Sequence, residues 1–257
     1  MKSTHIKKLA FSLVELSIVL VIVGLLVGGI LAGRSLINAS QLRSITVERD
    51  RFTTAVNAFR NKYFMLPGDL NNATSFWGTA AACPGTSGTP STDATTCNGD
   101  GNSQIDISST SNEQFRFWQH LSNAGLIEGI FSGVEGAAGS NDAIWGSNAP
   151  ASRFKKAGWA TDSSGVYGSS TVFHMDYGNV FKFGNYFANL AAYELALTPE
   201  EAWNLDTKSD DGMPGRGKVI ARRYGWCTNA VDRYDLDTTY LLSSPTVRCA
   251  LFFRFAY

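Results

Sequence analysis

Two short acidic stretches of this chain carry side chains of the kind that bind a hard cation. In residues 98–106, oxygen-bearing side chains alternate with small residues, and the candidate ligands are Asn98, Asp100, Asn102 and Asp106. Calcium takes about six to eight oxygen ligands, so backbone carbonyls or water must complete the shell. The alternative is an Asx turn in which water replaces the metal.

The second acidic stretch is residues 206–212, where the candidate calcium ligands are Asp206, Asp210 and Asp211. It also supplies fewer side-chain oxygens than calcium requires. Calcium is the only cofactor that the sequence suggests, and a solvated turn is again the alternative.

The glycine-rich residues 212–219 match most of the pattern of a phosphate-binding loop but lack two of its requirements. The pattern needs Ser or Thr after the lysine to bind Mg²⁺, whereas Val219 follows Lys218. It also connects a strand to a helix, whereas this stretch follows an acidic turn and precedes a strand-like sequence. We therefore expect no nucleotide binding.

Residue patterns typical of catalysis are weak. His120 falls beside the apolar face of a predicted helix, where packing is the commoner role, and His174 lies in a predicted strand near Asp176. Neither a GxSxG nor an HExxH pattern occurs. We expect that the protein is not an enzyme.

One carboxylate lies inside an apolar segment near the start of the chain. Lys7 and Lys8 precede this segment, which runs from Phe11 to Gly33 and contains Glu15. A charged side chain at bilayer depth costs about 2.5–3.5 kcal/mol on insertion scales. A single carboxylate there indicates a function or a partner.

Residues 7–11 (KKLAF), with Glu15 following, resemble the N-terminal signal of type IV prepilins and type II secretion pseudopilins. The resemblance implies cleavage between Ala10 and Phe11, N-methylation of Phe11, and assembly into a helical filament through the N-terminal helix. It also implies that Glu15 pairs with the N-terminal amine of a neighbouring subunit. The family usually has Gly where this chain has Ala10, and the Leu-Pro-Gly-Asp junction at residues 66–69 is a further likeness.

Two other interpretations of the apolar segment are a secretory signal peptide and a plain membrane anchor. A signal peptide has an apolar core of about 7–15 residues, which this segment exceeds. A plain anchor needs about 20 apolar residues, which the segment nearly supplies, but it leaves Glu15 without a role. Lysines before the segment predict a cytoplasmic N-terminus and a head on the other side of the membrane.

The four cysteines agree with an oxidising compartment. The pairs most easily closed are Cys83 with Cys97 and Cys227 with Cys249, although four cysteines allow three connectivities and free buried thiols are the alternative. Basic and acidic residues both number 22, and removal of the three leader lysines leaves 19 basic residues. A net charge of about −3 lacks the basic excess of a nucleic-acid binder.

The N-terminal residues form one predicted helix from Phe11 to Tyr63. The stretch 35–63 contains neither Pro nor Gly, and its apolar residues recur at helical spacing, with charged residues such as Glu48 on a predicted solvated face. Pro67 and Gly68 stop the helix. We expect a cleaved leader (1–10), a transmembrane and assembly half (11–33), an amphipathic half (34–66) and a periplasmic or extracellular head (67–257).

The head combines predicted helices with short strands. Helices are expected at residues 113–124, capped by Ser111 or Asn112, and from Thr198 onward. Strands are expected at residues 170–175, 180–183, 218–224 and 247–255. The predicted fold class is α+β, with a long N-terminal helix packed on a loop-rich antiparallel sheet.

The sequence thus predicts a structural subunit, a pilin, minor pilin or pseudopilin, of a type IV pilus or type II secretion filament. Expected partners are other pilin-like subunits, the prepilin peptidase, an assembly platform and the inner membrane. The expected location is a single pass through the inner membrane, followed by a periplasmic or extracellular filament. The alternative is a monomeric inner-membrane-anchored periplasmic protein that serves in binding or adhesion.

Overall fold

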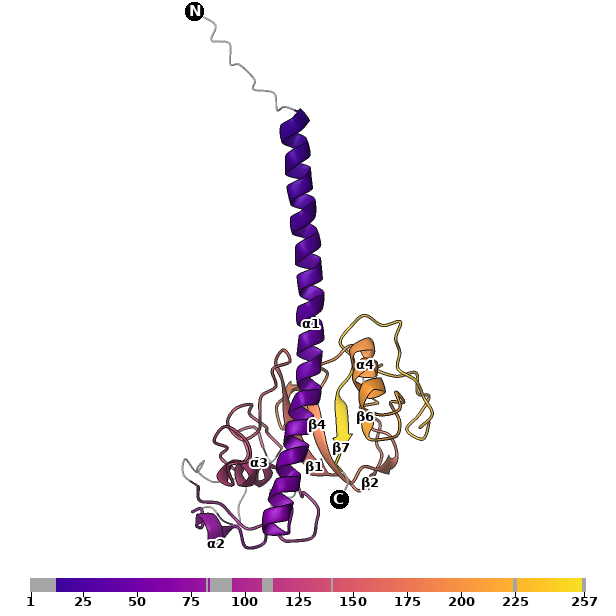
Figure 1. The fold of residues 1–257 in the computed structure, drawn as a ribbon. Coiled ribbons are helices and arrows are strands. Elements are labelled where there is room, and N and C mark those ends of the chain that lie inside the picture. The colour runs from indigo at the N-terminus through magenta and orange to yellow at the C-terminus, as the bar shows by residue number, and fades with distance from the viewer. Residues whose placement is uncertain are drawn as a thin grey trace, which may run out of the picture. The chain divides into compact units, whose positions relative to one another are not determined.

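The computed structural model describes residues 13–81, 83, 94–107, 113–139, 141–223 and 226–255 (Figure 1). The chain divides into two compact units, residues 1–41 and residues 42–257. From here on the second unit is called the head, so the head includes residues 42–66 in addition to the predicted 67–257. The proposed leader, Ala10 and Phe11 lie outside the described residues. A long N-terminal helix and an antiparallel sheet confirm the α+β class.

Helix α1 spans Leu13–Tyr63, and its residues from Leu42 onward belong to the head. Of the five apolar side chains predicted to share a face, four are buried there, namely Ile45, Phe52, Val56 and Phe59, and the fifth, Tyr63, is half-buried. The helix ends where Phe64 turns to a φ of 61°, shortly before Pro67. Gly68 follows with a φ of 85°, and a Cβ at this position would lie 2.6 Å from the Glu113 carbonyl oxygen. Only glycine fits both conditions.

Glu48 does not lie on a solvated face, so this part of the sequence prediction was wrong. Its carboxylate accepts hydrogen bonds from the Ser152 hydroxyl at 2.7 Å, the Arg153 amide at 2.9 Å and the Trp159 indole at 2.7 Å. Ser152 and Arg153 precede strand β1 (Ala157–Ser163), and Trp159 lies within it. Charge-assisted hydrogen bonds are about twice as strong as neutral ones, so Glu48 fixes α1 against the sheet.

The sheet is antiparallel and centres on strand β4, Asn179–Phe187. Its main path runs β1–β4–β7–β6, and β5 also pairs with β4. The other strands are β1 (Ala157–Ser163), β5 (Leu190–Glu194), β6 (Val219–Ala221) and β7 (Leu251–Arg254). A separate ribbon pairs β2 (Val166–Tyr167) with β3 (Met175–Asp176).

The part of α1 from Leu42 onward lies across one face of this sheet (Figure 1). Aromatic side chains fill the space between this part of the helix and the sheet. The Phe52 ring lies 5.0 Å from Trp118, 5.6 Å from Trp159 and 6.1 Å from Phe181, measured between ring centroids. The first two contacts are edge-to-face, a favoured geometry for aromatic pairs. All four of these aromatic residues are buried in the core of the head.

Short helices complete the head. Helix α2 is Thr74–Trp77, and α3 is Glu113–Asn123, close to the predicted 113–124. Gly125 follows α3 at a φ of 71°, as expected of a C-terminal cap, whereas the proposed N-caps Ser111 and Asn112 lie outside the described residues. Helix α4, Pro199–Ser209, begins with the predicted capping box between Thr198 and Glu201.

The predicted strands agree unevenly with the sheet. Residues 180–183 lie within β4, and β6 and β7 lie inside the longer predicted segments 218–224 and 247–255. The predicted strand 170–175 was wrong apart from Met175. There the Ser169 hydroxyl accepts the Thr171 amide hydrogen at 3.1 Å, a local turn that competes with a strand. Strands β1 and β5 were not predicted, because Gly158 and several alanines give them little strand propensity.

Candidate functional site

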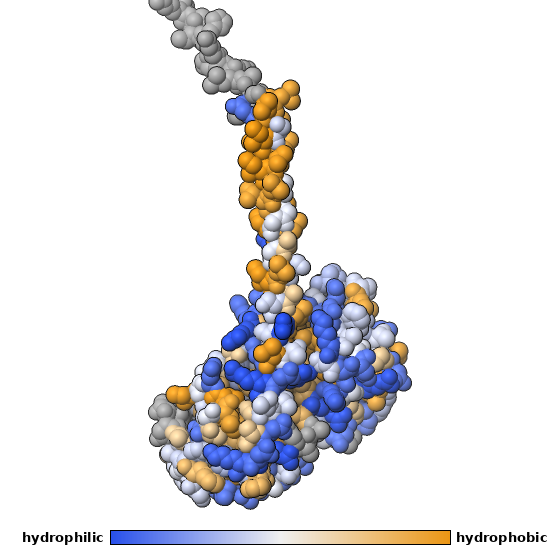
Figure 2. Space-filling model, in the orientation of Figure 1, coloured by the Kyte–Doolittle hydropathy of each residue, from blue (hydrophilic) through white to orange (hydrophobic). Residues whose placement is uncertain are grey.

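The N-terminal half of α1 carries a long and mostly apolar surface. Every side chain from residue 13 to residue 32 is exposed, and hydrophobic residues dominate this part of the helix (Figure 2). Exposed apolar area on this scale marks an interaction surface, because contact between apolar side chains and water is unfavourable in free energy. Within the described residues, α1 is long and apolar enough to span a membrane.

Glu15 lies in the first turn of α1. The free N–H groups of a helix N-terminus carry partial positive charge, so a carboxylate is stabilised at this position. Leu13, Val14 and Leu16 around it are all exposed. The structure therefore places one acidic group at the start of an apolar surface, whereas the residues that the resemblance assigns to processing lie outside the described part of the chain.

The first acidic loop is held together by hydrogen bonds of its side chains. The side-chain amide of Asn102 donates one hydrogen bond to a carboxylate oxygen of Asp100 and one to a carboxylate oxygen of Asp106, each at 3.0 Å. Asn98 accepts the Thr74 amide hydrogen at 2.9 Å. Asp100, Asn102 and Asp106 thus meet through the Asn102 side chain, whereas Asn98 is bonded to Thr74. An amide nitrogen lies between the two carboxylates.

Asp100 also lies near two carboxylates that were not predicted to belong to a site. Ligand oxygens of Asp69, Asp100 and Glu113 lie within 4.8 Å of one another. Asp69 accepts the Asn102 and Ser103 amides, and Glu113 accepts the Asp100 and Asp106 amides. Burial raises the pKa of Asp69 to about 6 and that of Glu113 to about 7, although these hydrogen bonds oppose the change. These buried carboxylates hold the loop together.

The second acidic loop brings its three predicted ligands together. Ligand oxygens of Asp206, Asp210 and Asp211 also lie within 4.8 Å of one another. Asp206 is buried and accepts the Tyr240 hydroxyl at 2.9 Å and the Gly212 amide at 3.2 Å. Burial raises its pKa to about 7, and the charges of Asp211 and Asp210 add to the effect. Tyr240 is a site residue that sequence reasoning missed, because it is 34 positions away.

Of the two loops, the second fits a calcium ion better. Its three carboxylates are hard oxygen donors, and two of them are partly exposed. Asp210 and Asp211 also accept nearby backbone amides, so a cation would replace some of these hydrogen bonds. The glycine-rich residues 212–219 connect α4 to β6, the helix-to-strand order opposite to that of a phosphate-binding loop.

Acidification is expected to stabilise the head between about pH 7.5 and pH 5. Asp69, Glu113 and Asp206 have raised pKa values in the folded state, so the folded chain binds more protons than the unfolded chain in this range. Stability therefore falls as pH rises through the folded pKa values, by at most about 1.4 kcal/mol per pH unit for each of these carboxyls. Thermal unfolding of the full chain in detergent measures this effect. Asp206→Asn should make the Tm depend less on pH, whereas replacement of the exposed Asp237 with Asn should leave the pH dependence unchanged. A Tm that drops on acidification would contradict the raised pKa values of these carboxyls.

Calcium is expected to raise the Tm at neutral pH through the second loop. A ligand that binds only the folded state stabilises it by mass action, by about 2.7 kcal/mol at a hundred times its Kd. Asp210→Ala should remove the difference between millimolar calcium and chelator, whereas Asp100→Ala should preserve it. Superimposable melting curves of the unmodified chain in calcium and in chelator would leave both loops as ordinary turns.

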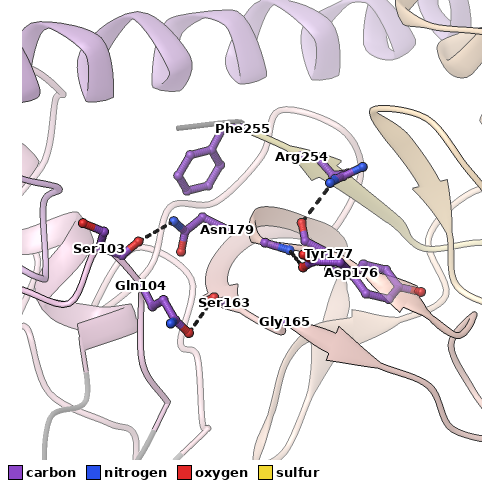
Figure 3. A pocket seen from close by; sticks show the side chains of 10 residues that line it. Ser103, Gln104, Ser163, Gly165, Asp176, Tyr177, Asn179, Arg254 and Phe255 are labelled. Atoms are coloured by element: carbon purple, nitrogen blue, oxygen red, sulfur yellow. Dashed lines mark hydrogen bonds between the residues drawn. The ribbon is translucent and has the colours of Figure 1, made fainter.

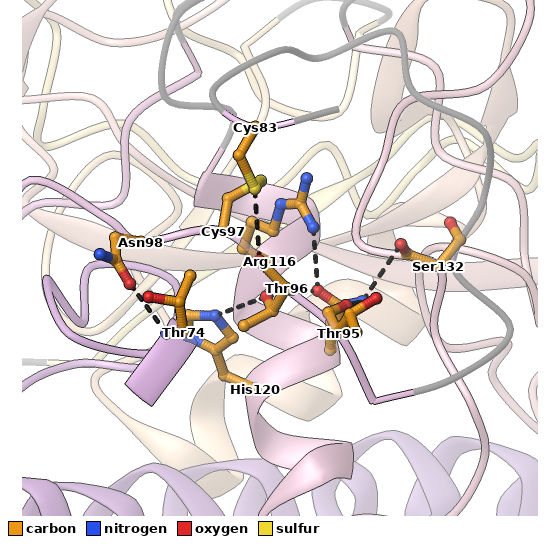
Figure 4. The surroundings of a disulfide bond; sticks show 10 residues. Thr74, Cys83, Thr95, Thr96, Cys97, Asn98, Arg116, His120 and Ser132 are labelled. Atoms are coloured by element: carbon orange, nitrogen blue, oxygen red, sulfur yellow. Dashed lines mark hydrogen bonds between the residues drawn. A yellow bond between two sulfur atoms is a disulfide. The ribbon is translucent and has the colours of Figure 1, made fainter. Parts of the chain in front are cut away.

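The cysteines form the disulfides Cys83–Cys97 and Cys227–Cys249, the pairing expected from their separations. A network of buried polar groups lies beside the first one (Figure 4). The Gly68 amide donates to His120 Nδ1 at 2.9 Å, so Nε2 carries the proton and donates to the Thr96 hydroxyl at 3.0 Å. Thr96 donates in turn to Gln119 at 2.6 Å. Burial lowers the pKa of His120 to about 3, so it is a neutral structural residue.

A cleft of about 530 Å³ opens between the end of the β1–β4 strand pair, at Ser163 and Asn179, and the loop after residue 102 (Figure 3). Its polar side chains hold these segments together. The Asn179 amide donates to the Ser103 carbonyl at 3.0 Å, and Arg254 Nε donates to the Tyr177 carbonyl at 3.3 Å. None of the described residues that line it is a histidine or a cysteine, so this lining contains no triad of catalytic type.

No family model, curated protein or solved structure matches this chain. Its function is therefore inferred from the residues and their geometry.

Proposed function

We propose that this chain is a structural subunit of a filament of the type IV pilus or type II secretion class. The observation that carries the proposal is the N-terminal half of α1, in which an exposed apolar surface begins with one carboxylate. A bilayer or neighbouring helices of the same kind bury such a surface. The prepilin-like residues before it support a single subunit that uses both environments in turn.

In this proposal the precursor first lies in the inner membrane. Lys7 and Lys8 keep the N-terminus cytoplasmic, and the head faces the periplasm, where disulfides persist. The prepilin peptidase then cuts between Ala10 and Phe11, and the new amine is methylated. Cleavage removes the positively charged lysines that precede the apolar segment, whereas the negatively charged Glu15 stays within it.

Assembly then uses the amine of Phe11 and the carboxylate of Glu15. Each compensates the opposite charge of a neighbouring subunit inside an apolar helix bundle, and the removal of one partner typically costs about 3–5 kcal/mol. Each subunit carries one amine and one carboxylate at different positions, so the contact is head-to-tail. A head-to-tail contact whose rotation does not close into a ring repeats as a helical filament, and we propose that this one does so.

The alternative function is a monomeric protein that is anchored by α1 and binds a ligand through its head. It shares the membrane helix and the disulfides, but it needs neither a free amine at residue 11 nor a carboxylate at residue 15. The chemistry of the N-terminus therefore separates the two functions.

The mature protein is expected to begin at N-methylated Phe11. The full gene is expressed in a host with an active prepilin peptidase, and the purified chain is analysed by intact mass and N-terminal sequencing. Ala10→Gly restores the residue that the family usually has and should preserve or increase cleavage, whereas a peptidase-deficient host should retain residues 1–10. Mature chains that begin near Gly33, or chains that retain Met1 in the active host, would reject the proposal.

A further inference from the structure

The head has a second cleft, of about 620 Å³, beside the second disulfide, Cys227–Cys249. Its lining includes the apolar residues Leu195, Trp226 and Val231 and the cationic residues Arg223 and Arg248. A volume of this size suits one or two rings of a small ligand, since ligand sites usually measure about 300–1,000 Å³. The cleft lies away from the acidic loops and the apolar half of α1 in sequence.

Trp226 is unfavourably placed for an isolated protein in two respects. Its side chain is 71% exposed, and its backbone adopts a φ of 65°, in the left-handed region that bulky residues avoid. Val231 beside it in the lining is 89% exposed. Strained backbone and exposed apolar surface at one place are typical of a ligand contact.

The second disulfide holds the two sides of the cleft in position. Trp226 directly precedes Cys227, and Arg248 directly precedes Cys249. Both cysteines are buried, and Cys249 is also held by backbone hydrogen bonds to Leu197 in each direction. The aromatic ring and one cation are therefore carried on a rigid base, which lowers the entropy that binding would cost.

The charges of the lining are all of one sign. Arg223 and Arg248 face the cleft, and none of the described residues that line it is acidic. The Nε atom of Arg223 is buried and makes no hydrogen bond, while its Nη2 atom donates to the Ser170 carbonyl. The Asp235 carboxylate accepts a hydrogen bond from the backbone amide of Val231, which lines the cleft, at 3.1 Å. An anionic group is the complement of this lining.

We infer that this cleft binds a carboxylated sugar, with one ring face on Trp226 and the carboxylate on Arg223 and Arg248. The C–H face of a sugar ring is apolar and packs on an aromatic ring, whereas its hydroxyls and carboxylate need polar partners. Guanidinium groups bind carboxylates through parallel charge-assisted hydrogen bonds. A uronic-acid unit of a polysaccharide combines both features at the size of the cleft.

Single-stranded nucleic acid also combines rings with negative charge, but it fits the cleft less well. Its binders use successive aromatic side chains along a basic groove, whereas Trp226 is the one aromatic residue among the described residues of this lining. The chain as a whole has no net positive charge to attract a polyphosphate. The inference for a uronic acid does not depend on filament assembly.

The test is calorimetric titration of the full chain in detergent with trisaccharides of galacturonate, mannuronate and guluronate. We expect saturable binding of at least one of them at one site per chain. Its methyl ester, which keeps the rings and removes the charge, should bind at least about tenfold more weakly. Trp226→Ala should abolish binding, Trp226→Phe should restore part of it, and Arg223→Gln and Arg248→Gln should each weaken it about tenfold.

Matched controls are Trp203→Ala and Arg216→Gln, which change a partly exposed tryptophan and arginine outside the lining and should leave the affinity unchanged. An unchanged Tm for each cleft variant shows that the head has folded. The inference is overturned if none of the three acids binds, if the ester binds as tightly as the acid, or if folded Trp226→Ala retains the affinity. Tighter binding of a thymidine oligonucleotide at this site would identify nucleic acid instead.

Discussion

Replacement of Glu15 with alanine is expected to abolish incorporation into filaments while membrane insertion continues. The variant segment is more apolar, since it no longer carries a group that costs about 2.5–3.5 kcal/mol at bilayer depth. In the filament, however, the amine of the neighbouring Phe11 would lose its partner, at a cost of about 3–5 kcal/mol for each contact. The measurements are the yield of sheared filaments and the amount of the chain in the membrane fraction.

Two variants make the Glu15 result specific. Glu128→Ala removes an exposed carboxylate of the head and should assemble normally. Glu15→Asp keeps the charge on a shorter side chain and should assemble better than Glu15→Ala. A normal filament yield from Glu15→Ala would remove the main support for the proposed function, because the carboxylate would then have no role in assembly.

The second large effect is expected from Phe52→Ala in the core of the head. Phe52 is 2% exposed and meets Trp118 and Trp159 edge-to-face. Deletion of a buried phenylalanine ring typically costs about 3–5 kcal/mol, a large part of the stability of a domain. The near-ultraviolet circular dichroism of the full chain in detergent should lose its tertiary signal at a much lower temperature.

Val47→Ala is the matched control for Phe52→Ala, since it also truncates an apolar side chain of α1. Val47 is exposed in the head, so its truncation should change the free energy of unfolding by less than about 0.5 kcal/mol. Similar melting temperatures for the two variants would show that the aromatic cluster does not hold α1 to the sheet.

The elements that the sequence predicted well are those with a local physical cause. Helix α1 follows from apolar spacing and from the absence of Pro until Pro67, and the start of α4 follows from the Thr198–Glu201 capping box. The disulfides follow from short separations along the chain. In each case the interacting residues are close in sequence, so the pattern contains the information.

Other elements could not be predicted because their cause lies elsewhere in the chain. Strand β1 is rich in small residues and becomes a strand because all seven of its residues pair with β4. Helix α3 was expected to bury one face, but residues 113–121 are all buried, because loops cover its polar side and bond to it. Tertiary contacts override local propensity in both cases.

The sequence by itself determined the apolar N-terminal helix with its single carboxylate, because hydrophobic periodicity and charge are properties of neighbouring residues. Only the tertiary structure decided which acidic groups meet. It bonded Asn98, one of the four ligands predicted around Asp100, to Thr74, brought Asp69 and Glu113 to that loop, and placed Tyr240 on Asp206. It also exposed Trp226 beside two arginines. Such groups come together through burial and backbone hydrogen bonds across long separations, which leave no local pattern in the chain.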